Sequence, residues 1–300
     1  GHLFLLKGMN QMKQMITGHT RLAALFAKPA KHSISPAMHN LSFEEQGIDA
    51  VYLAFDVEPD DLAASIQSIR QLDLLGVNLS MPHKMAAVPL MDECSPAAEL
   101  IGAINTIVNQ EGRLIGHNTD GIGFMRALED IQVSIIGDTM TVIGAGGAAT
   151  AIISQAALDG VKTIHVFNRK DEFYPIIQDK LTQIAEKTAC KITLADLEDQ
   201  TALKSAIDQS SLLVNATGVG MKPNDTVSPL KNKTLLRESL AVYDVIYNPR
   251  ETQLLKDAKA VGAKTANGLS MLLYQGAAAF KLWTGQEMPV EKVKALIESM

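Results

Sequence analysis

The chain has 300 residues, 47% of them hydrophobic and 20% charged, which is the composition of a globular protein rather than a disordered one. A single hydrophobic core stops growing at about 250–300 residues, so this length predicts two domains. With 27 Lys and Arg against 33 Asp and Glu, the formal net charge is −6 at pH 7. A mildly acidic chain without a basic stripe is a poor candidate for binding nucleic acid or an anionic membrane surface.

Two cysteines, Cys94 and Cys190, lie far apart in the sequence and are not accompanied by paired histidines. No disulfide framework or zinc spacing follows, so we expect no metal site and a reducing, cytoplasmic setting. The apolar runs fall far short of the ~20 residues of a membrane helix. The run Leu3–Leu6 is too short for a signal peptide, and we interpret residues 1–16 as a tag or disordered lead.

From about residue 20, short β-rich runs alternate with segments of helical period. In the first part of the chain, the predicted strands are 22–27, 51–57, 74–79 and the pair 104–108 and 114–116. Ser35-Pro36 predicts a helix with Ser35 as its cap and Pro36 at the first helical position, and Pro82 predicts the start of another. A further helix is predicted over 59–72, where apolar residues recur every three or four positions.

A second alternation begins near residue 139. Its predicted strands are 140–144, 163–168, 191–195, 212–216 and 241–246, with helical segments between most of them. The last two segments, 269–282 and 290–299, are helical with no strand between them. Repeated strand–helix–strand order indicates parallel sheets covered by helices, and therefore an α/β protein.

We expect two domains of different kinds. The first is an α/β substrate domain with a mixed, mainly parallel sheet, built from residues 17–119 and, discontinuously, 269–300. The second, residues 120–268, is a Rossmann-type doubly wound domain for a cofactor.

The strongest local motif follows the strand at 140–144. Residues Gly144-Ala145-Gly146-Gly147-Ala148-Ala149 fit the pattern G-x-G-x-x-A between a strand and a helix. Gly144 would permit the tight turn, Gly146 the close approach of backbone to a pyrophosphate, and Ala149 close packing of helix on strand. Amides at the helix start would hold the phosphates, so this segment predicts dinucleotide binding; a purely structural glycine turn is the alternative.

At the end of the next strand the sequence is Asn168-Arg169-Lys170-Asp171. In a dinucleotide-binding domain, residues at this strand end contact the adenosine ribose. Arg169 and Lys170 can pair with a 2′-phosphate, which favours NADP, whereas Asp171 can accept from a ribose 2′-hydroxyl, which favours NAD. A solvated charge cluster is the third interpretation. We favour NAD, with NADP also accepted.

Lys84 is the main candidate for proton transfer. On a helix that begins at Pro82 it would lie in the first turn, where the helix dipole and burial both favour a neutral amine. A neutral amine can accept the proton released when an alcohol is oxidised. The alternative is an ordinary surface lysine.

Several polar residues near predicted element ends are further candidates, each with a structural alternative. Asp120, expected at the junction of the two domains, could bind substrate or cap the helix that follows it. Asn105 could donate a hydrogen bond to a polyol or face outward from its strand. Ser33 and Ser35 could hold a substrate carboxylate, or Ser35 could act only as a cap.

Taken together, these motifs resemble the shikimate dehydrogenase family, in family order and over nearly the whole chain from about residue 20. The segments are His32–Asn40, Asn78–Lys84, Gly102–Thr106, Asn118–Gly121, Gly144–Ala149 and Tyr274–Ala277.

The resemblance implies a small-molecule oxidoreductase of the shikimate pathway of aromatic amino-acid biosynthesis, or a quinate dehydrogenase, transferring hydride at C3 of its substrate. It implies Lys84 and Asp120 as the catalytic pair and Ser33, Ser35 and Tyr247 as carboxylate-binding residues. The residues implied to bind ring hydroxyls are Ser80, Asn105, Asp120 and Gln275, and Tyr52 is a further substrate-side tyrosine. The implied cofactor contacts are Gly144, Ala145, Gly146, Gly147, Ala148, Asn168, Arg169, Lys170, Asp171, Gly218, Val245, Ile246, Tyr247, Asn248 and Gly268.

One segment departs from the NADP-specific, biosynthetic members, which carry Asn-Arg-Thr where this chain has Asn168-Arg169-Lys170. In this segment, and in having Ser80 where many relatives carry Thr, the chain resembles the quinate/shikimate dehydrogenase branch, which accepts both NAD and NADP. A strictly NADP-dependent shikimate dehydrogenase and a catalytically idle ligand sensor remain the alternatives. A homodimer is the expected assembly on the resemblance alone.

Overall fold

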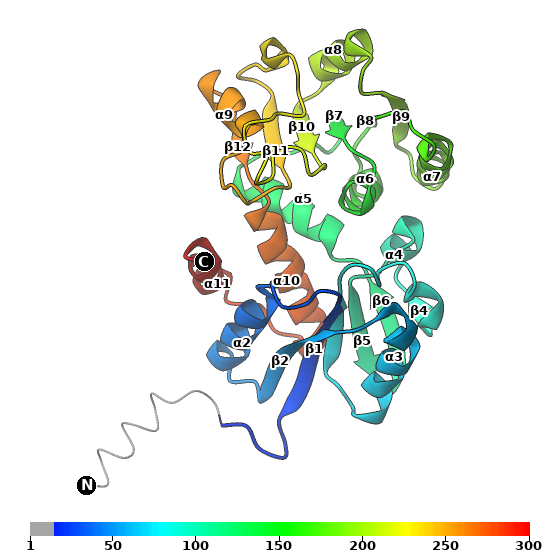
Figure 1. Ribbon diagram of the computed structural model, residues 1–300, viewed down its shortest axis with the longest axis vertical. Coiled ribbons are helices and arrows are strands. Elements are labelled where there is room, and N and C mark those ends of the chain that lie inside the picture. Colours follow the sequence, from blue (N-terminus) through cyan, green and yellow to red (C-terminus); the bar gives the residue numbers. More distant parts are fainter. Residues whose placement is uncertain (1–14) are drawn as a thin grey trace, which may run out of the picture. The chain divides into compact units, whose positions relative to one another are not determined.

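The computed structural model describes residues 15–300, which form two compact units (Figure 1). Apart from its last two residues, the lead expected over 1–16 lies outside the described residues. The first unit comprises the chain up to Ser95 together with Ala103–His117 and Gly276–Met300, and the second comprises Pro96–Gly102 and Asn118–Gln275.

The first unit is built on a six-stranded mixed sheet in the order β2-β1-β3-β5-β6-β4. β1 pairs in parallel with β2 and β3, whereas β5 is antiparallel to both β3 and β6. The strands are β1 (Arg21–Ala27), β2 (Ala50–Asp56), β3 (Gly76–Leu79), β4 (Glu93–Cys94), β5 (Thr106–Gln110) and β6 (Arg113–His117). The predicted strands of this half are confirmed with ends shifted by up to two residues. Asn105, expected within a strand, precedes β5, and the two-residue β4 was not predicted.

Helices pack on this sheet through an aromatic cluster. α2 (Ser35–Glu45) buries Phe43 against Phe280 of α10 (Leu269–Thr284), with ring centroids 5.6 Å apart. The other helical elements of the unit are η1 (Pro59–Asp61), α3 (Leu62–Gln71), η2 (Val88–Leu90) and α11 (Val290–Glu298). α3 buries its predicted apolar positions Leu62, Ile66 and Ile69.

The outer strand β2 is bonded along its free side by a side chain from α2. Asn40 Nδ2 donates to the Tyr52 carbonyl oxygen at 2.9 Å, and the Tyr52 amide donates to Asn40 Oδ1 at 2.8 Å. Both main-chain polar groups of Tyr52 are thus satisfied within the unit.

The second unit contains six parallel strands in the order β12-β11-β10-β7-β8-β9. Counted from β7, this is the 3-2-1-4-5-6 order of the doubly wound dinucleotide-binding fold, as predicted. The strands are β7 (Thr139–Ile143), β8 (Thr163–Asn168), β9 (Lys191–Asp196), β10 (Leu212–Asn215), β11 (Ala241–Asp244) and β12 (Thr265–Ala266). The helices are α4 (Pro96–Ile101), α5 (Asp120–Asp130), α6 (Gly147–Asp159), α7 (Tyr174–Glu186), α8 (Gln200–Gln209) and α9 (Gln253–Ala260), with η3 (Lys233–Leu235).

The helix predicted to begin at Pro82 does not form. Residues 81–87 are turns, and only the short η2 follows. The carbonyl oxygen of Lys84 accepts from the amide of Ile104 at 2.9 Å, and the amide four residues on, that of Val88, donates to the Met85 carbonyl oxygen at 3.2 Å. The Ala87 amide makes one helical bond, to the His83 carbonyl oxygen at 3.0 Å, but the next amide reaches back only three residues, so no α-helix continues and Lys84 does not lie in a first helical turn.

The prediction that Ser35 caps α2 is also wrong, by one residue. Ser35 is the first helical residue, the N-cap is Ile34, and the Ser35 amide donates to Ser33 Oγ at 3.1 Å. Pro36 does lie in the first turn, because its missing amide costs nothing there.

No helix among residues 15–300 combines the length and apolar character needed to cross a bilayer.

We predict that Gly76→Ala destabilises the first unit strongly. A Cβ at this position would lie 2.1 Å from Trp283 Nε1, which donates to the Ile107 carbonyl oxygen at 3.0 Å. The indole is buried and rigid, so we expect a loss of about 3 kcal/mol in the free energy of unfolding. Thermal unfolding followed by circular dichroism measures it. Gly18→Ala, where nothing lies within 4 Å, is the matched control and should unfold like the parent chain.

Candidate functional site

The first unit gathers several candidate residues at one edge of its sheet, where β3 ends and β5 begins. The Ser80 amide donates to the Phe26 carbonyl oxygen of β1 at 3.2 Å, and the Leu79 amide donates to that of Asn105 at 2.8 Å. Since Ile104 is bonded to Lys84, these main-chain contacts bring Ser80, Lys84 and Asn105 to the same edge. Ser80 is exposed, Lys84 is half-buried and Asn105 is buried.

A buried hydrogen-bond network orients Asn105. Tyr52 Oη donates to Asn78 Oδ1 at 2.9 Å, and Asn78 Nδ2 lies 3.2 Å from both the Asn105 carbonyl oxygen and Thr106 Oγ1. The Thr106 hydroxyl in turn donates to Asn105 Oδ1 at 3.0 Å. Each buried polar group has a partner, so the network fixes the side chain of Asn105.

Tyr52 lies inside this network and is not at the surface. Its side chain is fully buried, and burial raises the pKa of its hydroxyl above the ordinary value, with a hydrogen bond from Ser35 acting in the opposite direction. Its ring stacks on His39, with centroids 4.7 Å apart. Burial lowers the pKa of His39 to about 3, so this histidine is neutral at pH 7.

Sequence reasoning missed Asn78 and Thr106 as members of this arrangement. The available signal was a polar side chain within the strand Gly76–Leu79, all of whose residues are buried. A buried amide in a central strand must find partners, and here those partners are the candidate site residues.

In the second unit, Gly144 makes the turn between β7 and α6. Its φ is +113°, and its amide donates to the Phe167 carbonyl oxygen at 2.8 Å. A Cβ there would meet Thr217 Cγ2 at 2.9 Å and the Ala216 carbonyl oxygen at 3.0 Å. Gly144 is therefore required by the fold itself, as the tight turn predicts. Ala149 is fully buried, as its predicted packing role requires.

Gly146 and Gly147 have no such structural requirement. Neither has a positive φ, and a Cβ added to either would meet nothing within 4 Å. Gly146 is the N-cap of α6, and since it has no side chain it cannot accept a hydrogen bond from the first amides of the helix. Open space beside the first amides of a helix fits a phosphate group, so these residues could hold the pyrophosphate of a dinucleotide.

Charges of both signs lie at the end of β8. Asp171 Oδ1 accepts from the Phe173 amide at 2.9 Å, and Asp171 Oδ2 lies 3.4 Å from Arg169 Nε. The Arg169 side chain is 85% exposed, and Lys170 Nζ lies 5.6 Å from the centre of the Tyr174 ring. The carboxylate is held in place, while the two cations remain accessible.

Asp120 begins α5 and is not a cap, contrary to the structural alternative. The N-cap is Thr119, and the Asp120 amide donates to Asn118 Oδ1 at 3.1 Å. A Cβ on Gly123 of the same helix would lie 2.7 Å from the Gln275 amide nitrogen. The helices that carry Asp120 and Gln275 therefore touch through their backbones, and Gln275 Nε2 donates to the Leu272 carbonyl oxygen at 2.9 Å.

Further cofactor candidates lie on the segments that follow β10, β11 and β12. Gly218 and Asn248 are exposed, and Tyr247 is 37% exposed. The Gly268 amide donates to the Ile246 carbonyl oxygen at 3.1 Å, and a Cβ on Gly268 would lie 1.8 Å from the Val245 carbonyl oxygen. Only glycine fits there, so the main chain of Gly268 packs directly against the main chain of Val245 and Ile246.

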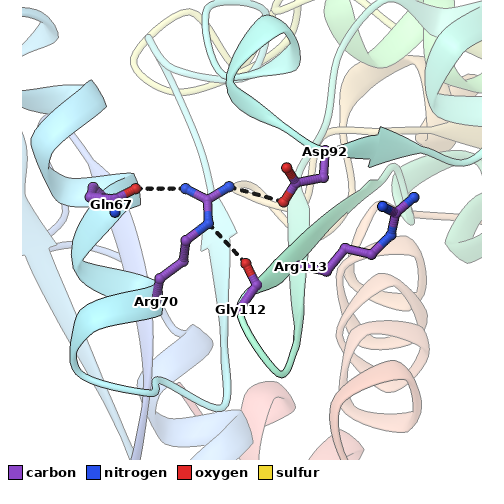
Figure 2. Close-up of a pocket in the computed structure, with 5 residues that line it drawn as sticks. All are labelled: Gln67, Arg70, Asp92, Gly112 and Arg113. Atoms are coloured by element: carbon purple, nitrogen blue, oxygen red, sulfur yellow. Dashed lines mark hydrogen bonds and ion pairs between the residues drawn. The ribbon is translucent and has the colours of Figure 1, made fainter.

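A separate surface pocket of about 460 Å³ lies at the hairpin between β5 and β6 (Figure 2). Arg70 donates to the Gly112 carbonyl oxygen at 2.8 Å, to Gln67 at 2.7 Å and to Asp92 at 3.0 Å. Arg70 therefore ties α3 to the hairpin, and none of the predicted site residues lines this pocket. Between residues 15 and 300, no group of three or more His, Cys, Asp or Glu side chains is arranged to hold a metal ion.

Comparison with known proteins identifies relatives that match nearly the whole chain. Residues 25–107 match the shikimate dehydrogenase substrate binding domain, and residues 268–298 match the shikimate 5′-dehydrogenase C-terminal domain. The chain is 50% identical over 288 residues to the shikimate dehydrogenase (NADP(+)) of Listeria monocytogenes serotype 4b (strain F2365), covering 96% of this chain and 99% of that protein. The chain belongs to the shikimate dehydrogenase family.

Solved structures of the shikimate dehydrogenase family and of a related enzyme have the same fold. The 1.45 Å crystal structure of shikimate 5-dehydrogenase from Listeria monocytogenes in complex with shikimate and NAD is 50% identical, with a TM-score of 0.93, over 96% of this chain and 100% of that one. Quinate dehydrogenase from Corynebacterium glutamicum in complex with NAD is 30% identical, with a TM-score of 0.83, over 94% and 99%.

We predict that two glycines of the same loop respond differently to alanine. Gly144→Ala introduces both a left-handed non-glycine residue and a clash with Thr217, so the second unit should lose about 2 kcal/mol or more of stability. Gly146→Ala meets no atom and should lose under about 1 kcal/mol, the difference between Gly and Ala at an N-cap. Urea unfolding measures both. Equal losses would contradict the distinction.

Proposed function

We propose that the protein is an NAD(P)-dependent oxidoreductase that interconverts shikimate and 3-dehydroshikimate, or quinate and 3-dehydroquinate. The observation that carries the proposal is its 50% identity, over 96% of the chain, to a relative named shikimate dehydrogenase and to a structure solved with shikimate and NAD. The candidate residues at the edge of the first sheet and in the glycine loop of the second unit support it.

Lys84 is the proposed proton-transfer group. During oxidation of the alcohol, the amine takes the proton of the C3 hydroxyl as the C3 hydrogen leaves as hydride; the reduction runs in reverse. A bound nicotinamide dinucleotide supplies the hydride acceptor or donor. Lys84 lies within turns rather than in the first turn of a helix, so the helix dipole expected from the sequence does not act on its amine.

Asp120 is the proposed partner of Lys84, and it would also bind a ring hydroxyl. Asp120 is the first residue of α5, and the hydrogen bond from its amide to Asn118 Oδ1 holds its backbone there. The proposed carboxylate contacts are Ser33, Ser35 and Tyr247, and the other proposed hydroxyl contacts are Ser80, Asn105 and Gln275.

We assign Tyr52 an indirect part in substrate binding. Its ring is fully buried, and its hydroxyl reaches Asn105 through Asn78 and Thr106. Its contribution is therefore to fix the Asn105 amide that would meet a ring hydroxyl.

The proposed cofactor site is in the second unit, and the proposed substrate residues other than Asp120, Tyr247 and Gln275 are in the first. Gly146 and Gly147 would receive the pyrophosphate, and the segments 168–171, 218 and 245–248, with Gly268, would hold the remainder. NAD is favoured because the fixed Asp171 carboxylate can accept from a ribose 2′-hydroxyl and repels a 2′-phosphate. NADP is also accepted, because Arg169 remains exposed.

Two alternatives are supported less well. The name of the Listeria relative, which specifies NADP(+), favours a strictly NADP-dependent biosynthetic enzyme. A catalytically idle sensor would need no Lys84. A reducing cytoplasmic setting and a homodimer belong to the same proposal and rest on cysteine usage and family resemblance.

A four-way assay tests the proposal: NAD and NADP, each with shikimate and with quinate. Turnover with at least one pair supports the enzyme, and the ratios assign the cofactor and the alcohol. Background turnover with both molecules bound would overturn the proposal in favour of the sensor.

We predict that Lys84→Ala lowers kcat by about 10²–10⁴-fold, the range for loss of a general acid–base group. The KM of the alcohol should change much less, because few binding contacts are removed. Steady-state kinetics on purified variants measures both values, and Lys281→Ala, an exposed lysine paired with Glu287, is the control. Near-normal kcat in the Lys84 variant would exclude this lysine from proton transfer.

We predict that Asp171→Ala shifts cofactor selectivity toward NADP by about tenfold, equivalent to 1.4 kcal/mol. The change removes the negative charge that opposes a 2′-phosphate and releases Arg169 from its ion pair. The ratio of kcat/KM for the two cofactors measures the shift, with Asp208→Ala, a paired aspartate of α8, as the control. Unchanged selectivity would argue against this role of Asp171.

A further inference from the structure

Asp244, the last residue of β11, is a fully buried carboxylate that the proposed chemistry does not use. Its Oδ1 accepts from Asn215 Nδ2 and from the Ile246 amide, each at 3.1 Å, and its Oδ2 accepts from Thr252 Oγ1 at 2.8 Å. Burying an unpaired carboxylate is very unfavourable, so these three donors are what allow it to stay inside. Burial nevertheless raises its pKa above the ordinary value.

The same network continues through Asn215 into the loop after β10. Asn215 Oδ1 accepts from the Thr217 amide at 3.1 Å and from Thr217 Oγ1 at 2.7 Å, while its Nδ2 also donates to the Val219 carbonyl oxygen at 3.2 Å. The Val219 amide donates to Thr217 Oγ1 at 3.1 Å. The path of the loop 217–219 is therefore fixed by one buried amide, which is itself held by Asp244.

Strand order places this network beside the glycine loop. Asn215 is in register with Asp244 on one side and with Ile143 on the other, and Thr217 is the residue that crowds Gly144. This is the switch point of the doubly wound sheet, beside which dinucleotides bind in this fold.

The two loops that Asp244 joins carry exposed apolar side chains. Val219 is 41% exposed and Met221 is 50% exposed on one loop, and Tyr247 is 37% exposed on the other. Ligand sites are lined mainly by apolar and aromatic side chains, so these exposed side chains beside the switch point would suit a flat, partly apolar ring.

We propose that Asp244 is a positioning residue for cofactor binding, which holds the loops 217–219 and 245–248 in the arrangement that receives the nicotinamide end of the dinucleotide. The inference rests on the proposed function. Asp244 touches neither substrate nor cofactor; it acts through Asn215, Ile246 and Thr252.

The test uses the full chain and two substitutions at this position. Asp244→Ala leaves three donors without an acceptor, whereas Asp244→Asn keeps an acceptor oxygen for Asn215 and Ile246 and offers an amide to Thr252 Oγ1. The control is Thr141→Val, which removes a buried hydrogen bond to Ser210 (2.8 Å) from the middle of β7 in the same sheet. Calorimetry gives the dissociation constants of NAD and NADP, and hydrogen exchange of the ligand-free protein gives the protection of the two loops.

We expect Asp244→Ala to weaken cofactor binding about tenfold or more and to speed exchange at 217–219 and 246 by a similar factor. Asp244→Asn should remain within about threefold of the parent chain in both measurements, and Thr141→Val should lower the melting temperature without changing either. Binding by Asp244→Ala within twofold of the parent, or equal loss in the Asn variant or in Thr141→Val, would overturn the assignment.

If Asp244→Ala does not fold, Thr217→Val serves instead, because it cuts the same network at its half-buried end in the loop. Faster exchange at Val219 in the ligand-free Val variant, together with weaker cofactor binding, supports the proposal; unchanged exchange overturns it. Failure of the parent chain to bind either dinucleotide would overturn the proposed function as well, whereas binding by the parent with no effect of the variants overturns this inference alone.

Discussion

Polar side chains buried at the ends of strands must find hydrogen-bond partners, and this requirement shapes both halves of the molecule. In the first unit the amide of Asn78 binds Tyr52, Thr106 and the main chain of Asn105. In the second, Asn215 and Asp244 bind one another and the loops that follow them. In each case the partners are the segments that carry candidate site residues, so the same bonds that make burial tolerable also set the geometry of the site.

Glycines play two distinct parts beside these networks. Gly144 and Gly268 have no room for a side chain because main-chain or side-chain atoms of the protein already lie there. Gly146 and Gly147 are surrounded by open space, so their lack of a side chain matters only to what binds beside them. The first pair of glycines is required for the chain to fold, whereas the second pair is required only by the proposed binding of a cofactor.

The strand pattern was predictable because each parallel strand is a short apolar run between turn residues, and β8 was predicted with its bounds unchanged. The two-residue strands β4 and β12 were not, because two residues carry no periodicity. The helix expected at Pro82 was wrong: the chain there forms turns, and Lys84 is bonded to Ile104, twenty positions away, a contact that local propensity cannot register. The candidate residues came from motif order, whereas the bonds that orient them, through Asn78 and Asp244, depend on strand neighbours that only the folded sheet defines.

The side chain of Asn40 has a consequence for how copies of this protein meet. By occupying both main-chain groups of Tyr52 in the middle of the outermost strand, it imitates the neighbour that the strand lacks. A strand from another molecule could join that edge only by first displacing this amide. The exposed Leu53 and Phe55 on the same strand would otherwise invite such an addition, so Asn40 protects the protein against aggregation by sheet extension.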